Sequence, residues 1–182
     1  RAGFEIISRQ MILEAGAIDI DGNGLCVTTR QCLLNPNRNP GLSQSDIEQH
    51  LFQDLDLRQI LWLQDGLAED HTDGHVDNLA RFVGPGLLAI PKASGSDDPN
   101  AAIFSAAREV ARTAGVDVAS VASVGRHVVD SKVVPASHMN FYIGNAVSRL
   151  ALLDEFQHFR LNIDREHLAL GHQFRNPEGE IA

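Results

Sequence analysis

The side chains best suited to chemistry gather in residues 69–78, which read E-D-H-T-D-G-H-V-D-N. His75 and Asp77 are two positions apart, so in an extended backbone both side chains point to the same face. An imidazole beside a carboxylate can transfer protons near neutral pH. A carboxylate can also hold a guanidinium group through paired, charge-assisted hydrogen bonds. The stretch therefore suits acid–base chemistry, the binding of a cation, or both.

The residues alone leave three interpretations of this stretch open. The first is a solvated acidic loop without a chemical role. The second is a metal site, because His71, His75 and Asp77 carry the imidazole and carboxylate groups that bind Zn²⁺ or Mn²⁺. The stretch lacks the helical H-E-x-x-H spacing, however, and offers no clear fourth ligand. The third is metal-free acid–base chemistry on a bound cation.

The elements on either side of this loop must position it, and their order repeats. Before the loop we expect an extended segment, a turn, a strand, a helix and a strand, at residues 6–20, 21–24, 25–29, 43–55 and 59–63. After the loop the same order recurs at residues 79–83, 84–86, 87–90, 97–113 and 116–121. A repeat of roughly 60 residues is typical of a modular or propeller-like α/β architecture. A simple α/β sandwich is the alternative.

The C-terminal part of the chain has a different texture. A third unit begins at residues 139–143, and the domain is expected to end at about residue 148. Residues 149–182 form an unmatched tail, whose first part has a helical stripe made by Leu150, Leu153, Phe156 and Phe159. The rest of the tail is expected to be irregular.

Composition excludes several classes of partner. A formal net charge of −9 argues against nucleic acid and against an anionic membrane surface as the main partner. No apolar run approaches the length needed to span a membrane, and no signal peptide is evident. Two cysteines, Cys26 and Cys32, do not make a disulfide framework, so we expect a reducing, cytoplasmic setting. The first residue is not Met, and we expect that the ends of this chain are not those of a natural protein.

Four segments resemble, in the same order, signatures of agmatine deiminases and of bacterial peptidylarginine deiminases in the pentein superfamily. They span about residues 10–147, and an ordered set of motifs is far more specific than any one of them. The segments are L-E-A-G-A-I at 13–18, T-T followed by C-L-L-N-P-N-R-N at 28–39, T-D-G-H-V-D-N at 72–78 and P-A-S-H-M-N-F-Y-I at 135–143.

The resemblance implies a fold, a reaction and roles for individual residues. The implied fold is a partial pentein α/β propeller of ββαβ units, and the implied reaction hydrolyses the guanidinium C–N bond of agmatine without a cofactor. The products are N-carbamoylputrescine and ammonia, on the way to putrescine. In family terms His75 is the general acid–base and Asp77 grips the guanidinium, while Glu14 and Asn140 line the pocket. His71 stands where some members carry a carboxylate that touches substrate.

Two parts of the family pattern are absent from these 182 residues. One is the late G-G-x-x-H-C-I segment with the cysteine nucleophile, and the other is an early R-D-x-G-P segment. Cys26 and Cys32 match early strand positions instead, and Cys32 is expected to pack in the core. Ala15 also replaces a family glycine. We therefore expect a fragment that is inactive on its own.

Other functions stay open at this point. Within the family, peptidylarginine is the alternative substrate. Outside it, the alternatives are a metal-dependent hydrolase that uses His71, His75 and Asp77, or a non-catalytic pentein remnant that binds guanidines. The strand edges left by missing units favour self-association, so a homo-oligomer is expected.

Overall fold

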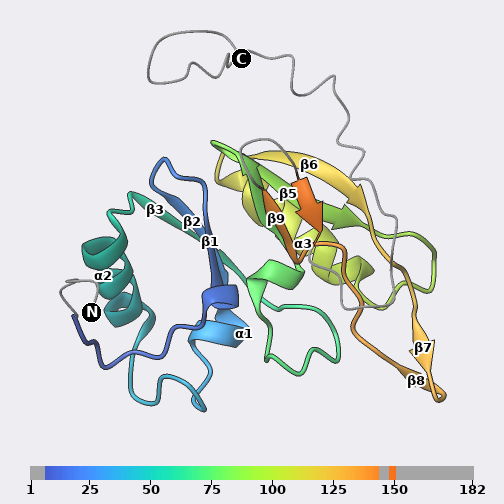
Figure 1. Cartoon of the computed structure of the whole chain (residues 1–182), viewed down its shortest axis with the longest axis horizontal. Helices are drawn as coiled ribbons and strands as arrows, with labels where there is room; N and C mark the ends of the chain where they lie inside the picture. Colours follow the sequence, from blue (N-terminus) through green and yellow to red (C-terminus); the bar gives the residue numbers. More distant parts are fainter. Residues whose placement is uncertain (1–6, 144–147, 151–182) are drawn as a thin grey trace, which may run out of the picture.

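The computed structural model describes residues 7–143 and, for their backbone, residues 148–150. The first unit is a three-stranded sheet with two helices beside it (Figure 1). Its strand β2 pairs antiparallel with β1 and parallel with β3. The elements are β1 (Ile18–Ile20), β2 (Leu25–Thr29), α1 (Arg30–Leu33), α2 (Gln44–Leu55) and β3 (Gln59–Leu63).

The second unit repeats this topology. Strand β5 pairs antiparallel with β4 and parallel with β6, and one long helix forms the crossover. The elements are β4 (Arg81–Gly84), β5 (Leu87–Lys92), α3 (Ala101–Thr113) and β6 (Asp117–Ala122). The predicted repeat of ββαβ units is therefore confirmed. A small hairpin of β7 (Val128–Val129) and β8 (Lys132–Val133) leads to a further antiparallel pair, β9 (Phe141–Ile143) and β10 (Ser148–Leu150).

Local sequence explains the turns and helix ends. The β1–β2 turn places Gly22 and Gly24 at positive φ, and Asp21 Oδ1 accepts hydrogen bonds from the amides of Asn23 (2.7 Å) and Leu25 (3.0 Å). Helix α2 begins after a capping box, in which Ser43 and Asp46 satisfy each other's backbone amides. These are short-range signals, so the hairpin and the helix were predictable from the sequence.

The main core joins the two sheets. Helix α3 buries Phe104, Ala107 and Ala111 against both, together with apolar residues of β2, β3, β4 and β5. Strand β5 is buried over four consecutive residues, as expected of a central strand covered on both faces. A second cluster lies under α2, and a third packs β9 on β5 and β6. The two units therefore share one hydrophobic interior.

Three predicted boundaries differ from the structure. The segment before the first hairpin is not extended throughout, because Ala15–Ala17 forms a 3₁₀ turn, η1, before β1 begins at Ile18. The strand after the polar loop begins at Arg81 rather than at Leu79. In the expected tail, Leu150 belongs to strand β10, and the other residues of the predicted helical stripe lie outside the described residues.

Carboxylates on the first hairpin connect it to the second unit. Asp19 Oδ2 accepts a hydrogen bond from the Phe82 amide at 2.6 Å and forms an ion pair with Arg81 Nε at 3.2 Å. Arg81 also donates to the Phe141 carbonyl at 3.0 Å, and its guanidinium lies 5.3 Å from the centre of that ring. Asp19 and Arg81 thus join β1, β4 and β9, which belong to three successive units.

We expect Asp19→Ala to destabilise the chain by about 2–4 kcal/mol, because it leaves the Phe82 amide and the partly buried Arg81 without their carboxylate. The measurement is urea unfolding followed by circular dichroism. Asp54→Ala is the matched control, since Asp54 pairs with Arg9 on the surface and should leave the midpoint unchanged. Equal effects of the two substitutions would show that Asp19 does not join the units.

Candidate active site

Close backbone contacts shape the loop that carries the polar stretch. Gly66 lies directly against the backbone of Gly74, so that a Cβ at residue 66 would collide with it. Gly74 has a φ of +85°, which favours glycine, and its carbonyl accepts a 2.5 Å hydrogen bond from Thr29 Oγ1 at the end of β2. Gln31 Oε1 accepts from the Gly66 amide at 2.8 Å. The loop is therefore fixed against the first sheet just before His75.

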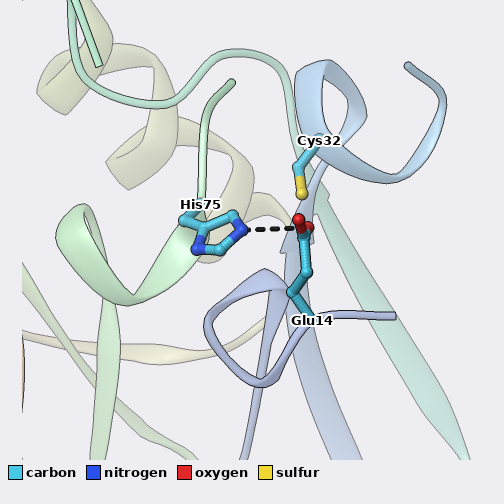
Figure 2. Close-up of side chains that lie close together, drawn as sticks. All are labelled: Glu14, Cys32 and His75. Atoms are coloured by element: carbon cyan, nitrogen blue, oxygen red, sulfur yellow. Dashed lines mark hydrogen bonds and ion pairs between the residues drawn. The ribbon is translucent and has the colours of Figure 1, made fainter. Parts of the chain in front are cut away.

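His75 does not lie in extended backbone, as its spacing from Asp77 suggested. It is the N-cap of a 3₁₀ turn, η2 (Val76–Asn78), so the assumption of an extended backbone was wrong, although both side chains do approach the same point at Gly16. The His75 ring points to Glu14, which is the N-cap of η1. The Nε2 atom of His75 lies 3.0 Å from Glu14 Oε2 (Figure 2). These two residues are 61 positions apart. The carboxylate that bonds to the His75 ring in this structure is therefore that of Glu14.

Glu14 also holds a buried guanidinium. Arg38 Nε donates to Glu14 Oε2 at 2.5 Å and Nη2 donates to Oε1 at 3.3 Å. The same guanidinium donates to the Thr72 carbonyl at 2.6 Å, and its side chain is only 11% exposed. These hydrogen bonds to Arg38, followed by that to His75, lower the pKa of Glu14 below its usual value, while partial burial opposes the shift. The carboxylate is thus held ionised beside the imidazole.

Asp77 has the opposite environment. Its Oδ1 is buried and has no hydrogen-bond partner among the described residues, while Oδ2 accepts only a long bond of 3.5 Å from Asn140 Nδ2. Burial raises the pKa of Asp77, and the nearby charges of His75 and Arg81 oppose that shift. A buried carboxylate oxygen without a partner is costly, and such groups call for an explanation. An incoming cationic donor would satisfy it.

Gly16 lies where His75 and Asp77 approach each other. A Cβ at this residue would be 2.5 Å from Asp77 Oδ2 and 2.6 Å from His75 Nδ1, which is closer than real contacts allow. The His75 ring therefore has Glu14 at its Nε2 and the Gly16 and Asp77 side at its Nδ1. Glycine at this point lets the two loops close around the imidazole.

The structure adds one residue that sequence reasoning assigned to the core. Cys32 is fully buried as expected, yet its Sγ lies within 4.8 Å of the ligand atoms of both Glu14 and His75. Burial raises its pKa to about 11, so the thiol is protonated at neutral pH. Cys26, on β2, is also buried and has a pKa of about 12. An apolar sequence context gave no signal that Cys32 faces the site.

The other predicted residues are placed as follows. Asn140 is exposed, but its amide contacts Asp77, which brings it to the site. His71 is exposed and does not belong to the group of possible ligands, so the predicted metal set of His71, His75 and Asp77 is not brought together in the described part of the chain. A shallow cavity of about 400 Å³ lies elsewhere, between β3 and the end of α3.

Comparison with known proteins identifies the family of this chain. Residues 1–157 match the family of Porphyromonas-type peptidyl-arginine deiminases. The chain belongs to this family. The family match continues past residue 148, where the domain was expected to end, and the boundary itself stays a prediction.

The chain is also similar to individual proteins, namely solved structures and a curated relative. It is similar to a cysteine-to-serine variant of C. jejuni agmatine deiminase with substrate bound, at a TM-score of 0.70 and 31% identity over 75% of this chain and 41% of that one. It is also similar to an Enterococcus faecalis agmatine deiminase, at a TM-score of 0.63 and 30% identity over 74% of this chain and 43% of that one. A Marinomonas sp. (strain MWYL1) protein named "Putative agmatine deiminase" is 47% identical over 108 residues.

These matches support three conclusions. The α/β units form a partial pentein propeller, since the described sheets do not close into a ring. The family consists of hydrolases that act on C–N bonds. The aligned part makes up 59% of this chain but 29% of the Marinomonas protein, so the chain spans well under two thirds of the relatives that it matches. Within the described residues, no helix is long and apolar enough to cross a bilayer.

We expect Gly16→Ala to destabilise the chain by about 1–3 kcal/mol, because the added Cβ overpacks the contact between His75 and Asp77. Urea unfolding measures the loss, and the imidazole resonances of His75 report the displaced ring. Gly84→Ala is the matched control, since no atom lies within 4 Å of a Cβ there. An unchanged His75 environment in Gly16→Ala would contradict the close approach.

We expect Asp77→Asn to raise the stability at pH 7 by roughly 1 kcal/mol, because it replaces a partly desolvated, poorly paired carboxylate with a neutral amide. The midpoint of urea unfolding measures the gain. Asp73→Asn is the control, because Asp73 accepts from Arg38 at 3.4 Å and should gain nothing. A clear loss of stability in Asp77→Asn would show that its attraction to His75 and Arg81 outweighs its desolvation.

Proposed function

We propose that this chain is the acid–base and guanidinium-holding part of an agmatine deiminase. The observation that carries the proposal is the His75 imidazole, which has ionised Glu14 at one nitrogen and the under-paired Asp77 near the other. A proton-transfer group beside a carboxylate with a free, buried oxygen suits a flat cation with several N–H donors. The relatives named as agmatine deiminases support agmatine as that cation.

The residues then take distinct roles in the reaction. Asp77 accepts hydrogen bonds from two guanidinium N–H groups, and Asn140 donates a further, long hydrogen bond to that carboxylate. A cysteine thiolate attacks the guanidinium carbon, and ammonia leaves after His75 donates a proton to it. His75 then takes a proton from water, which attacks the same carbon and displaces the thiolate. Agmatine and water thus become N-carbamoylputrescine and ammonia, a step toward putrescine.

The nucleophile in this scheme comes from outside the present chain. No G-G-x-x-H-C-I segment occurs in the sequence, and both of its cysteines are buried with raised pKa values. Thiols protonated at neutral pH are poor nucleophiles. The chain alone is therefore proposed to bind substrate without turning it over. The expected cytoplasmic setting fits two unpaired cysteines, and it remains part of the proposal.

Peptidylarginine is the second candidate substrate, because the matched family is named for it. The guanidinium end is the same in both ligands, so Glu14, His75 and Asp77 do not distinguish them. The distinction lies in what contacts the other end of the substrate. We propose that the exposed side chain of His71 contacts that other end.

Calorimetry with two matched ligands tests the proposal. Agmatine should bind to the chain, whereas putrescine, which has the same amine tail but no guanidinium, should bind at least about tenfold more weakly. Asp77→Asn should abolish this preference, and Asp54→Asn, on the surface, should keep it. Equal affinities for the two ligands would refute a guanidinium site. A blocked arginine amide that binds more tightly than agmatine would favour peptidylarginine.

An ammonia assay separates binding from turnover. The purified chain should release no ammonia from agmatine above the buffer background, because the thiolate step has no nucleophile here. Agmatine binding without ammonia release supports the proposal that this chain holds the guanidinium and that the nucleophile comes from outside it. Ammonia release that disappears in His75→Ala would contradict it and would require a nucleophile among the residues of this chain.

A further inference from the structure

Three side chains with metal-binding atoms converge beside the imidazole. A carboxylate oxygen of Glu14, the sulfur of Cys32 and a ring nitrogen of His75 all lie within 4.8 Å of one another. In Figure 2 the ring and the thiol both face the carboxylate. A tetrahedral zinc ion, with bonds of about 2.0–2.3 Å, separates its ligand atoms by roughly 3.3–3.8 Å. Modest side-chain rotations would therefore close this set around an ion.

Cys32 has no part in the proposed guanidine hydrolysis, yet it is aimed at the site. Its side chain is fully buried and its Sγ makes no hydrogen bond within the described residues. The N-cap bond from Thr29 Oγ1 to the Cys32 amide fixes the short helix α1 that holds the residue. Cys26, by contrast, donates its thiol to the Val27 carbonyl. The thiol of Cys32 is therefore available as a ligand.

Charged groups of both signs act on the thiol. Among these charges the guanidinium of Arg38 has the largest single effect on Cys32, and the carboxylates of Glu14, Asp73 and Asp70 act against it. Arg38 bonds to both oxygens of Glu14, so it can keep one oxygen while the other turns to an ion. Ligating carboxylates are commonly held by such outer hydrogen bonds. Glu14 is also 42% exposed at its side chain, which gives an ion a route in from solvent.

We propose that Glu14, Cys32 and His75 form a binding site for a zinc-class transition metal ion, which blocks the guanidine site. Thiolate and imidazole ligands select zinc over calcium or magnesium. As the metal–sulfur bond forms, the S–H bond of Cys32 breaks and its proton passes to the buffer, with no change in oxidation state. Water completes the coordination sphere. The bound ion occupies an imidazole nitrogen of the residue that proton transfer needs and the carboxylate that holds its ring.

Cobalt(II) titration of the purified chain tests the site directly. Cobalt takes the same ligands as zinc, and thiolate ligation produces a sulfur-to-cobalt charge-transfer band in the near ultraviolet. We expect this band to saturate at one cobalt per chain and to disappear when zinc is added. Binding without such a band would overturn the proposal, because the histidines elsewhere in the sequence can bind cobalt without sulfur.

The two cysteines make a matched pair of variants. Cys26→Ser should keep the charge-transfer band and Cys32→Ser should lose it, since the chain has no other cysteine. The Cys26→Ser result decides the assignment even if Cys32→Ser fails to fold. Glu14→Gln, at a partly exposed side chain, should weaken cobalt binding at least about tenfold. A band that is lost in Cys26→Ser, or unaffected by Glu14→Gln, would refute this ligand set.

The blocking effect rests on the proposed function and is tested separately. Saturating agmatine should weaken cobalt binding at least about tenfold, while putrescine should leave it unchanged. If the thiolate band forms but agmatine has no effect, the metal site stands and its overlap with the guanidine site is refuted. If agmatine does not bind in calorimetry at all, the proposed function fails while the cobalt result still decides the metal site.

Discussion

The carboxylate of Glu14 is the interaction on which the site depends. It lies at the start of η1 and receives both the guanidinium of Arg38, from the loop before α2, and the imidazole of His75, from the start of η2. Arg38 in turn donates to the Thr72 carbonyl, so three loops meet at one ionised group. Such a shared carboxylate stays charged because its partners are cationic or can become so. It orients the ring that would move the proton.

The local part of this structure was readable from the sequence. The D-G-N-G turn, the capping box at Ser43 and the continuous apolar run of β5 each act within a few residues, and each formed the predicted element. Because strand order follows from these elements, the ββαβ repeat was also predictable. The prediction that His75 and Asp77 are chemically active came from their residue types together with the resemblance to a family signature, and it stays a prediction. The contacts that hold the His75 ring were not predicted.

The backbone that joins His75 to Asp77 was not predicted. In a strand, a separation of two residues places both side chains on one face, whereas here the chain turns into η2 and both side chains still approach Gly16. The contact between Glu14 and His75 joins residues 61 positions apart, which no local rule addresses. Cys32 lies in an apolar run and is buried, so its sequence context indicated packing. Its approach to Glu14 and His75 is a contact between distant parts of the chain, which its sequence context does not reveal.

The two carboxylates beside His75 differ in what they leave free for a substrate. Glu14 already bonds to Arg38 and His75, so an incoming guanidinium must share it with a side chain that has the same chemical group. Asp77 has a buried oxygen without a partner in the described structure and a raised pKa, so it gains most from a cationic donor. Under the proposed function, Asp77 therefore supplies most of the binding energy for the guanidinium, and Glu14 holds the ring. The instability of an unfilled Asp77 is then the structural cost of a site that recognises a cation.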